Sequence, residues 1–189
     1  MYLRKPVSGI WLKTHRKTQV KIEMQCLIIA AGRGSRLRSK GESKPLTPII
    51  GVPLIERVIH CALEAGVDEF VIVTGYQSQQ VSYFLANLAD RLGILIETVV
   101  NQQWQKQNGI SVLKAREHLQ ELFLLLMADH IFDSSIIGTL VNYPLGENEI
   151  ALAVDSNLQN PLIDLEDVTR VKTENGNCLL YTSPSPRDA

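Results

Sequence analysis

The sequence predicts a three-layer α/β fold with a mostly parallel sheet. Short apolar runs alternate along the chain with segments whose apolar residues recur at helical spacing. The first apolar run, 27–31, is unbroken, as expected for a strand that is covered on both faces. Right-handed crossovers then place the loops that follow the strands along one edge of the sheet, where ligands collect.

The individual elements follow from the same patterns. Five strands are expected, at 27–31, 70–73, 94–100, 122–127 and 150–154. A first helix begins at Pro53 and stops at Gly66, a glycine placed just past a helix end. A second helix carries apolar residues from Val81 to Leu92 and ends at Gly93, and a third covers 111–119. Asp133 opens a short fourth helix as its N-cap.

Composition indicates one globular domain with a real core. The chain has 189 residues, of which 45% are hydrophobic, and a net charge of −1. This balance favours neither nucleic acid nor a membrane surface as a partner. The three cysteines lack paired spacing, which argues against a zinc site or a disulfide framework. We interpret Cys26 and Cys61 as small core residues in a reducing compartment, the cytoplasm.

Both ends of the chain look foreign to the domain. Residues 1–23 show neither the helical nor the strand spacing of apolar residues, and they carry six lysines and arginines but no secretory signal. Met24 directly precedes the first predicted strand. Residues 178–189 contain "CLLYTSPSPRD", which resembles a translated transposase library adapter, with a proline-containing linker as the alternative. We therefore expect a domain over 24–177 that is incomplete at its C-terminus.

The loop after the first strand has the composition of a polyanion site. Gly32 and Gly34 let the backbone approach a ligand closely, and Arg33, Arg36 and Lys44 supply positive charge. A basic surface turn is the alternative. The glycine spacing fits neither a Walker loop nor the dinucleotide fingerprint, whose third glycine would stand at Leu37.

Three further motifs also follow strands. They are Thr74-Gly75-Tyr76, the segment that begins at Asn101, and Asp129, which ends the most apolar strand. A carboxylate at the end of such a strand needs a partner, because apolar surroundings penalise an unpaired charge. One partner available to Asp129 is the start of the next helix, which it could cap. The four motifs should therefore meet at one sheet edge.

These residues carry a family resemblance. "LIIAAGRGSRLRSKGESKPLTPIIGVPLIERVI" is similar to the signature of nucleotidyltransferases that activate sugar or alcohol phosphates, the MobA-like NTP transferases. "VIVTGYQ", "NQQWQKQNGISVLKARE" and "LLLMADHIFDSSII" resemble CTP:inositol-1-phosphate cytidylyltransferases and phosphocholine-activating relatives, and "NPLIDLEDVTRV" resembles the inositol-phosphate branch. The resemblance implies a Rossmann-like nucleotidyltransferase fold over about 25–177.

The resemblance also implies residue roles. Arg36 and Lys44 would bind the phosphates and act in catalysis, and Asp129 would hold Mg²⁺. The residues implied to bind the nucleotide are Ala30, Ala31, Gly32, Gly34, Arg36, Thr74, Gly75 and Tyr76. Those implied to bind the acceptor and the nucleotide sugar are Asn101, Trp104, Asn108, Gly109 and Ser111. Asp164, Glu166 and Asp167 would contact a polyol, with an exposed acidic turn as the alternative.

Several assignments stay open at this point. Arg33 stands at the variable position of the motif and is expected to face solvent. Lys44 precedes Pro45, so its backbone is expected to be extended. Trp104 is either a core anchor or an aromatic contact for a hydroxylated or quaternary-ammonium substrate. His130 is either a substrate contact or structural. The family's second aspartate is expected beyond Asn177, with Asp155 as a substitute.

The function implied is transfer of a nucleotidyl group, CMP from CTP, to a small alcohol phosphate with release of pyrophosphate. Inositol-1-phosphate is the first candidate acceptor, phosphocholine the second, and a sugar-1-phosphate with another nucleotide the third. A non-catalytic nucleotide-binding module is the rival from another class. Oligomeric state is left open.

Overall fold

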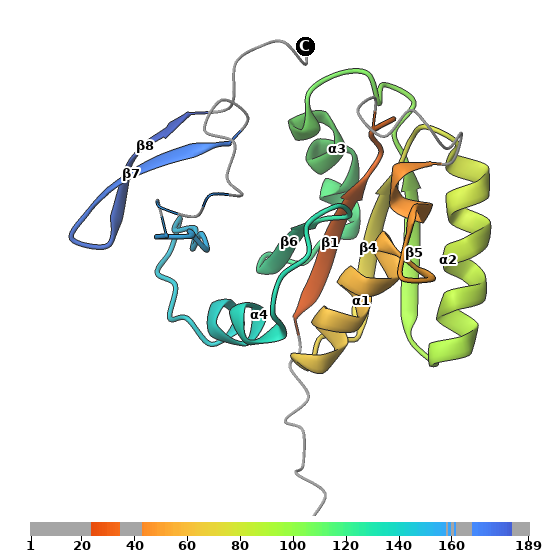
Figure 1. Ribbon diagram of the computed structural model, residues 1–189, viewed down its shortest axis with the longest axis horizontal. Helices are drawn as coiled ribbons and strands as arrows, with labels where there is room; N and C mark the ends of the chain where they lie inside the picture. Colours follow the sequence, from red (N-terminus) through yellow and green to blue (C-terminus); the bar gives the residue numbers. More distant parts are fainter. Residues whose placement is uncertain (1–23, 35–42, 158, 160, 162–167, 183–189) are drawn as a thin grey trace, which may run out of the picture.

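A parallel four-stranded sheet forms the centre of the molecule (Figure 1). The computed structural model describes residues 24–34, 43–157, 159, 161 and 168–182. The strands of the sheet are β1 (Gln25–Ala30), β4 (Glu69–Thr74), β5 (Leu95–Val100) and β6 (Phe123–Met127), in the order β5-β4-β1-β6. Each neighbouring pair is parallel. The predicted parallel α/β fold is therefore confirmed.

Helices cover both faces of this sheet. Apolar side chains of α1 (Leu54–Glu64), α2 (Ser78–Leu92) and α4 (Ser134–Val141) join one core cluster with Ile28 and Ile72. On the opposite face α3 (Asn108–Ala115) packs Ala115 against Leu27 and Val71. A 3₁₀ turn, η3 (Arg116–His118), continues α3. The strands alternate between the two clusters because successive side chains of a strand point to opposite faces.

Two predicted helix signals are confirmed in atomic detail. After α1, Gly66 has φ +94° and its N–H bonds the carbonyl of Leu63, while the Val67 N–H bonds that of Ala62. This pair of bonds is a Schellman motif, which needs the left-handed backbone that glycine adopts freely. At the start of α4 the Asp133 carboxylate accepts the Ser135 N–H at 2.9 Å. Both ends therefore satisfy backbone groups that a helix leaves unpaired.

The predicted strand at 150–154 is wrong. Residues 150–157 have no regular structure, and Ile150 is 92% exposed. The segment has a strand-like composition, but a strand also needs a neighbour to accept its hydrogen bonds. Among the described residues β6 has no second neighbour in the sheet. Composition alone therefore could not decide this element.

A separate hairpin lies near the C-terminal end of the described chain. It pairs β7 (Arg170–Glu174) with β8 (Asn177–Thr182) in antiparallel register. Residues 178–182 of the segment interpreted as foreign belong to β8, whereas 183–189 and the leader 1–23 lie outside the described residues. The domain boundaries remain predictions.

A second hairpin connects the predicted site to α1. It joins the short strands β2 (Pro48–Ile49) and β3 (Val52–Pro53), and the Arg57 side chain of α1 holds it by donating to the Ile49 carbonyl, with Nε at 3.2 Å. At its tip Ile50 has φ +50° and is 93% exposed. The hairpin directly follows the 3₁₀ turn η2 (Lys44–Leu46), so this bond also restrains the segment that carries Lys44.

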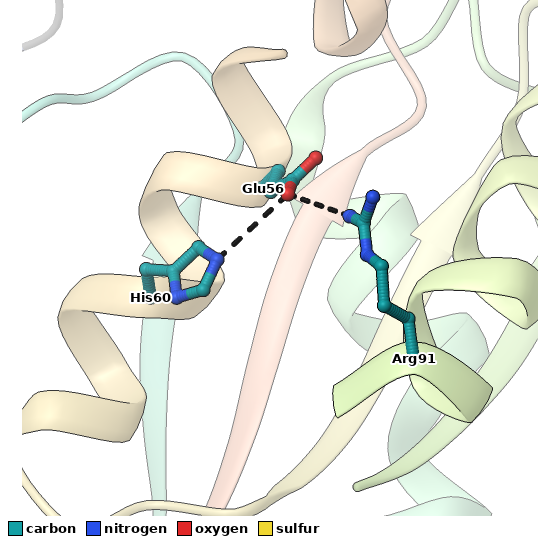
Figure 2. Close-up of polar contacts among 3 residues, drawn as sticks. All are labelled: Glu56, His60 and Arg91. Carbon is teal, nitrogen blue, oxygen red and sulfur yellow. Dashed lines mark hydrogen bonds and ion pairs between the residues drawn. The ribbon is translucent and has the colours of Figure 1, made fainter. Parts of the chain in front are cut away.

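An ion pair links the two helices on the same face of the sheet (Figure 2). Glu56 Oε1 of α1 lies 2.6 Å from an Arg91 nitrogen of α2 and 3.8 Å from His60 Nε2. Exposed pairs of this kind contribute about 0–1 kcal/mol. The contact between Glu56 and Arg91 therefore joins α1 to α2 without adding much to stability.

The described residues contain no helix that is both long and apolar enough to cross a bilayer. The cysteines are all free. Cys26 is fully buried in the sheet, and burial raises the pKa of its thiol. Cys61 donates to the Phe132 carbonyl at 3.4 Å. Both side chains are core residues, as predicted.

The packing between α1 and the sheet yields a stability prediction. Ile59 is completely buried, so Ile59→Ala should lower the free energy of unfolding by about 2–5 kcal/mol through a lost side chain and a residual cavity. Ile50→Ala makes the same chemical change at an exposed position and serves as the matched control, with an expected effect within about 0.5 kcal/mol. Urea denaturation followed by circular dichroism measures both. Equal losses in the two variants would contradict this description of the core.

Candidate functional site

The loops at the carboxyl edge of the sheet are bonded to one another. The Tyr76 N–H donates to the Ala31 carbonyl at 2.9 Å, and the Ala128 N–H donates to the Ile29 carbonyl at 3.1 Å. The Asn101 N–H donates to the Thr74 carbonyl at 2.8 Å. The segments that follow β1, β4, β5 and β6 therefore form one connected rim, as the sequence predicts.

A pocket of about 150 Å³ opens in this rim beside the end of β1. It combines apolar walls with the charged ends of two side chains. The residues that line it are Ile29, Ala30, Gly32, Gly34, Lys44, Pro45, Asn108, Met127, Ala128 and Asp129. Six of the ten belong to the predicted site: Ala30, Gly32, Gly34, Lys44, Asn108 and Asp129. The pocket is therefore the main candidate for ligand binding.

Lys44 and Asp129 form an ion pair inside this pocket. Lys44 Nζ contacts Asp129 Oδ2, and each side chain is about one-third exposed or less. Asp129 follows β6, whereas Lys44 is the first residue of η2. The extended backbone predicted for Lys44 is wrong, because Pro45 is accommodated in the 3₁₀ turn, where its fixed φ suits a first helical turn.

Two glycines shape the path of the Lys44 side chain and the mouth of the pocket. Gly34 has φ +65°, and a Cβ there would lie 2.5 Å from Lys44 Cβ and 2.6 Å from its Cδ. Only glycine lets the aliphatic stem of Lys44 cross the loop at this point. A Cβ on Gly32 would meet nothing within 4 Å, so the backbone there stays open to an approaching ligand.

Opposing effects set the charge state of Asp129. Burial raises the pKa of its carboxyl group, but the hydrogen bond and positive charge of Lys44 lower it further, so that the net pKa lies below the ordinary 3.8. His130 Nε2 lies 3.9 Å from Asp129 Oδ1, and its side chain is 67% exposed. The carboxylate is thus ionised at neutral pH and is compensated by a single lysine.

An aromatic group lies on the other side of the β1 loop. Tyr76 and Trp104 meet edge to face, with ring centroids 5.3 Å apart. Behind them Gly75 contacts Trp104 so closely that a Cβ would lie 2.5 Å from Trp104 Cβ. The Arg33 guanidinium carbon lies 5.5 Å from the centre of the Tyr76 ring. Trp104 also packs against the core cluster of the α3 face, so it is an anchor that reaches the rim.

The segment 101–111, which follows β5, lies partly in the core and partly at the surface. Asn101 and Ser111 are buried, and Asn101 Nδ2 donates to Ser111 Oγ at 3.0 Å. Asn101 Oδ1 accepts the Gln103 N–H at 2.9 Å, which shapes the loop that carries Trp104. Asn108 and Gly109 are exposed in the first turn of α3, which begins before the predicted 111. Ligand contacts by these residues remain predictions.

Thr74 is also fully buried, and its hydroxyl has no hydrogen-bond partner among the described residues. The remaining candidates lie elsewhere. Arg36, Asp164, Glu166 and Asp167 fall outside the described residues. Asp155 accepts the Asn157 N–H at 2.8 Å in the irregular segment after α4. The described part of the chain contains no cluster of three or more His, Cys, Asp or Glu side chains suited to a metal ion.

Sequence reasoning missed two features of the site. It did not place the Lys44 stem against Gly34, and it did not pair Arg33 with Tyr76. Gly34 in the motif indicated that some group approaches the backbone closely there, but residue spacing could not identify that group as the Lys44 side chain. The Arg33 contact left no sequence signal, since it joins loops that follow different strands.

The ion pair yields a prediction about titration. With metals chelated, the Asp129 carboxyl should titrate below 3.8, because Lys44 outweighs burial. The pKa of this carboxyl is lower in the folded than in the unfolded protein. The ion pair therefore stabilises the fold fully at pH values above the unfolded-state pKa, and this contribution is lost as the pH falls through the folded-state pKa. In Lys44→Met burial still raises the pKa of Asp129, and only His130 and a backbone hydrogen bond still lower it, so the pKa should rise.

Carboxyl ¹³C NMR measures this pKa. Lys114→Met, which removes an exposed lysine of α3, is the control and should leave the Asp129 titration unchanged. An identical Asp129 pKa in the wild type and in Lys44→Met would show that the ion pair is absent in solution.

Known proteins share this fold and much of this sequence. The Bifunctional IPC transferase and DIPP synthase of Rubrobacter xylanophilus is 32% identical over 161 residues, which cover 85% of this chain and 35% of that protein. The Bifunctional protein GlmU of Methanococcus maripaludis is 36% identical over 141 residues, which cover 73% of this chain and 31% of that protein. The chain thus spans about a third of the length of these curated relatives.

A solved structure extends the likeness in three dimensions. The inositol-1-phosphate CTP transferase from T. maritima superposes with a TM-score of 0.66 at 19% identity, covering 85% of this chain and 64% of that one. At this identity the likeness concerns the fold. The model of the MobA-like NTP transferase domain matches residues 26–174, which include every described residue of the rim. The chain therefore belongs to the family of MobA-like NTP transferase domains.

Proposed function

We propose that this domain is a nucleotidyltransferase that transfers CMP from CTP to a small alcohol phosphate, with inositol-1-phosphate as the first candidate. One observation carries the proposal. In a chain of the MobA-like NTP transferase family, Lys44 and Asp129 meet in a glycine-lined pocket at the carboxyl edge of the sheet. A cation, a carboxylate and open backbone are what a charged nucleotide and its counterion require.

The reaction joins two anions. An oxygen of the acceptor phosphate attacks the α-phosphorus of the triphosphate, and the bond from that phosphorus to the bridging α–β oxygen breaks. The electron pair leaves with pyrophosphate, and the new phosphoanhydride bond joins the two phosphates of the product, a CDP-alcohol. Little covalent chemistry falls to the protein, so catalysis depends on positioning and on neutralising charge.

The described residues suit these two tasks. The Lys44 ammonium can move from the Asp129 carboxylate to a phosphate oxygen, because its stem is guided by Gly34 while its tip is partly exposed. The open backbone at Gly32 admits the ligand. Arg36 is assigned to the triphosphate on the motif alone, since a guanidinium fork matches phosphate oxygens.

Asp129 is the proposed ligand for Mg²⁺. The donor set fits this ion, which proteins commonly hold through one or two carboxylates plus substrate phosphates. Asp129 supplies one such carboxylate, kept ionised in the ligand-free protein by Lys44. When bound, the ion would neutralise charge on the phosphates. The protein's own contribution is to hold that carboxylate at the rim, next to Lys44.

The acceptor and the base are assigned by likeness. The Rubrobacter relative is named an IPC transferase, which favours inositol phosphate and CTP. Phosphocholine stays the second candidate, because the aromatic pair Tyr76 and Trp104 could contact a quaternary ammonium group. A Haloferax volcanii relative, 28% identical over 115 residues, is named a UTP–glucose-1-phosphate uridylyltransferase, which keeps a sugar-1-phosphate with another nucleotide as the third candidate. The free cysteines suit a reducing compartment, so we assign the domain to the cytoplasm.

A substrate panel tests the proposal. Pyrophosphate release is measured for CTP, UTP, GTP and ATP, each with inositol-1-phosphate, phosphocholine or glucose-1-phosphate and Mg²⁺. The proposal expects the highest rate with CTP and inositol-1-phosphate. Release only with phosphocholine would select the second candidate, and release only with a sugar-1-phosphate the third. Nucleotide binding by calorimetry without release from any pair would support a non-catalytic module and contradict the proposed enzyme.

Lys44 provides the sharpest mutational prediction. Lys44→Met keeps most of the aliphatic stem against Gly34 but removes the charge, so turnover should fall about 10²–10³-fold, the order found for one charge-stabilising donor. Pyrophosphate release under saturating substrates measures the loss. Lys114→Met is the matched control on α3 and should retain wild-type turnover. Unchanged turnover in Lys44→Met would exclude Lys44 from the reaction.

A further inference from the structure

Arg33 is exposed, as the sequence predicts, yet its side chain is held in place. Its guanidinium carbon lies 5.5 Å from the centre of the Tyr76 ring, within the range of a cation–π contact. Exposed arginines ordinarily sample many rotamers, and ordering one costs conformational entropy. The contact with Tyr76 favours one placement of the Arg33 side chain in the ligand-free protein.

The ring that supports Arg33 is itself rigidly supported. Trp104 meets Tyr76 at an interplanar angle of 65°, and the Tyr76 N–H donates to the Ala31 carbonyl at 2.9 Å. Gly75 fits between these groups, because a Cβ there would lie 2.5 Å from Trp104 and 2.7 Å from the Ala31 carbonyl oxygen. Residues after β1, β4 and β5 thus build one platform for a single cation.

The charge on this platform is uncompensated within the described residues, where no carboxylate pairs with Arg33. The guanidinium group carries five N–H donors, which can bind phosphate oxygens. Because no carboxylate accepts from these donors within the described residues, the contact with Tyr76 leaves the hydrogen-bonding capacity of Arg33 available.

Arg33 lies beside the pocket, so its free hydrogen-bond donors are near the proposed ligand site. Arg33 stands between Gly32 and Gly34, both of which line the pocket. Tyr76 follows β4, and Asp129 follows β6, on the opposite side of β1. The loop after β1 is thus flanked by two cations, Lys44 on the β6 side and Arg33 on the β4 side. Lys44 is already paired with a carboxylate, whereas Arg33 is not.

We propose that Arg33 is a further phosphate-binding residue, preset by Tyr76, for a substrate phosphate that Lys44 does not neutralise. The inference rests on the proposed function, which brings a triphosphate and a phosphomonoester into one site. Their combined negative charge exceeds the positive charge of Lys44, Arg36 and one Mg²⁺ together. The phosphate could belong to the nucleotide or to the acceptor, and the guanidinium fork suits both.

Trp104 offers a direct reporter, since it is one of the two tryptophans of the sequence and touches the ring beneath Arg33. In a Trp11→Phe background of the full chain, fluorescence titrations with CTP, pyrophosphate, cytidine and inositol-1-phosphate measure binding without turnover. Arg33→Gln should lower the affinity for those ligands whose phosphate contacts Arg33. The expected loss is about 10–100-fold, the range for a pair of charge-assisted hydrogen bonds. Cytidine affinity should not change.

Variants at Arg33 and Tyr76 separate charge from preorganisation. Arg33→Lys keeps the charge without the planar fork and should give an intermediate loss. Tyr76→Leu should weaken phosphate binding several-fold because Arg33 is no longer held, and Tyr76→Phe, which keeps the ring face, should lose less affinity than Tyr76→Leu. Arg116→Gln, on an exposed arginine of η3, is the control and should leave every affinity unchanged.

The pattern of losses decides the outcome. A loss confined to CTP and pyrophosphate assigns Arg33 to the nucleotide, and a loss confined to inositol-1-phosphate assigns it to the acceptor. Equal affinities in the wild type and Arg33→Gln would overturn this inference while leaving the proposed function in place. An equal loss for cytidine and CTP would also overturn it, as it would show a merely structural role. Failure of every phosphate ligand to bind the wild type would instead reject the proposed function.

Discussion

The contact between Lys44 and Asp129 is the interaction on which the rest of the site depends. Each charge lies in the partly buried rim, where its partner offsets the cost of desolvating it. The contact in turn requires a glycine at position 34, where no other side chain leaves space for the lysine stem. The bond from Arg57 to the Ile49 carbonyl holds the hairpin that follows η2, the turn that carries Lys44.

This arrangement explains how a charged site can be preformed. In the ligand-free protein the lysine and the carboxylate compensate each other at the rim. An anionic ligand with its own cation can replace both partners at once, since the lysine turns to the anion and the carboxylate to the cation. The protein then exchanges one set of ion pairs for another, and little reorganisation is needed when the substrates arrive. The glycine-lined pocket provides the room for that exchange.

The sequence was sufficient for the features that follow from topology. Parallel strands place their carboxyl ends together, so Gly32, Lys44 and Asp129 could be brought to one rim from their order along the chain. The sequence was insufficient for features that depend on how segments pack against one another. The segment 150–154 has a strand composition but no partner, and Lys44 lies in a 3₁₀ turn despite the following proline. The contact between Arg33 and Tyr76 depends on a distance between two loops, which no spacing encodes.

The most direct test of the account locates the bound metal–nucleotide complex. Manganese and CTP are added together to ¹⁵N-labelled protein, and paramagnetic broadening of the amide signals is recorded. If the pocket binds the nucleotide, the amide signals of Gly32, Gly34 and Asp129 broaden first. The signals of Gln25 and Glu69, at the opposite edge of the sheet, stay sharp. Broadening centred away from this rim, with sharp signals at Gly34 and Asp129, would contradict the claim that the lysine–carboxylate pocket is the nucleotide site.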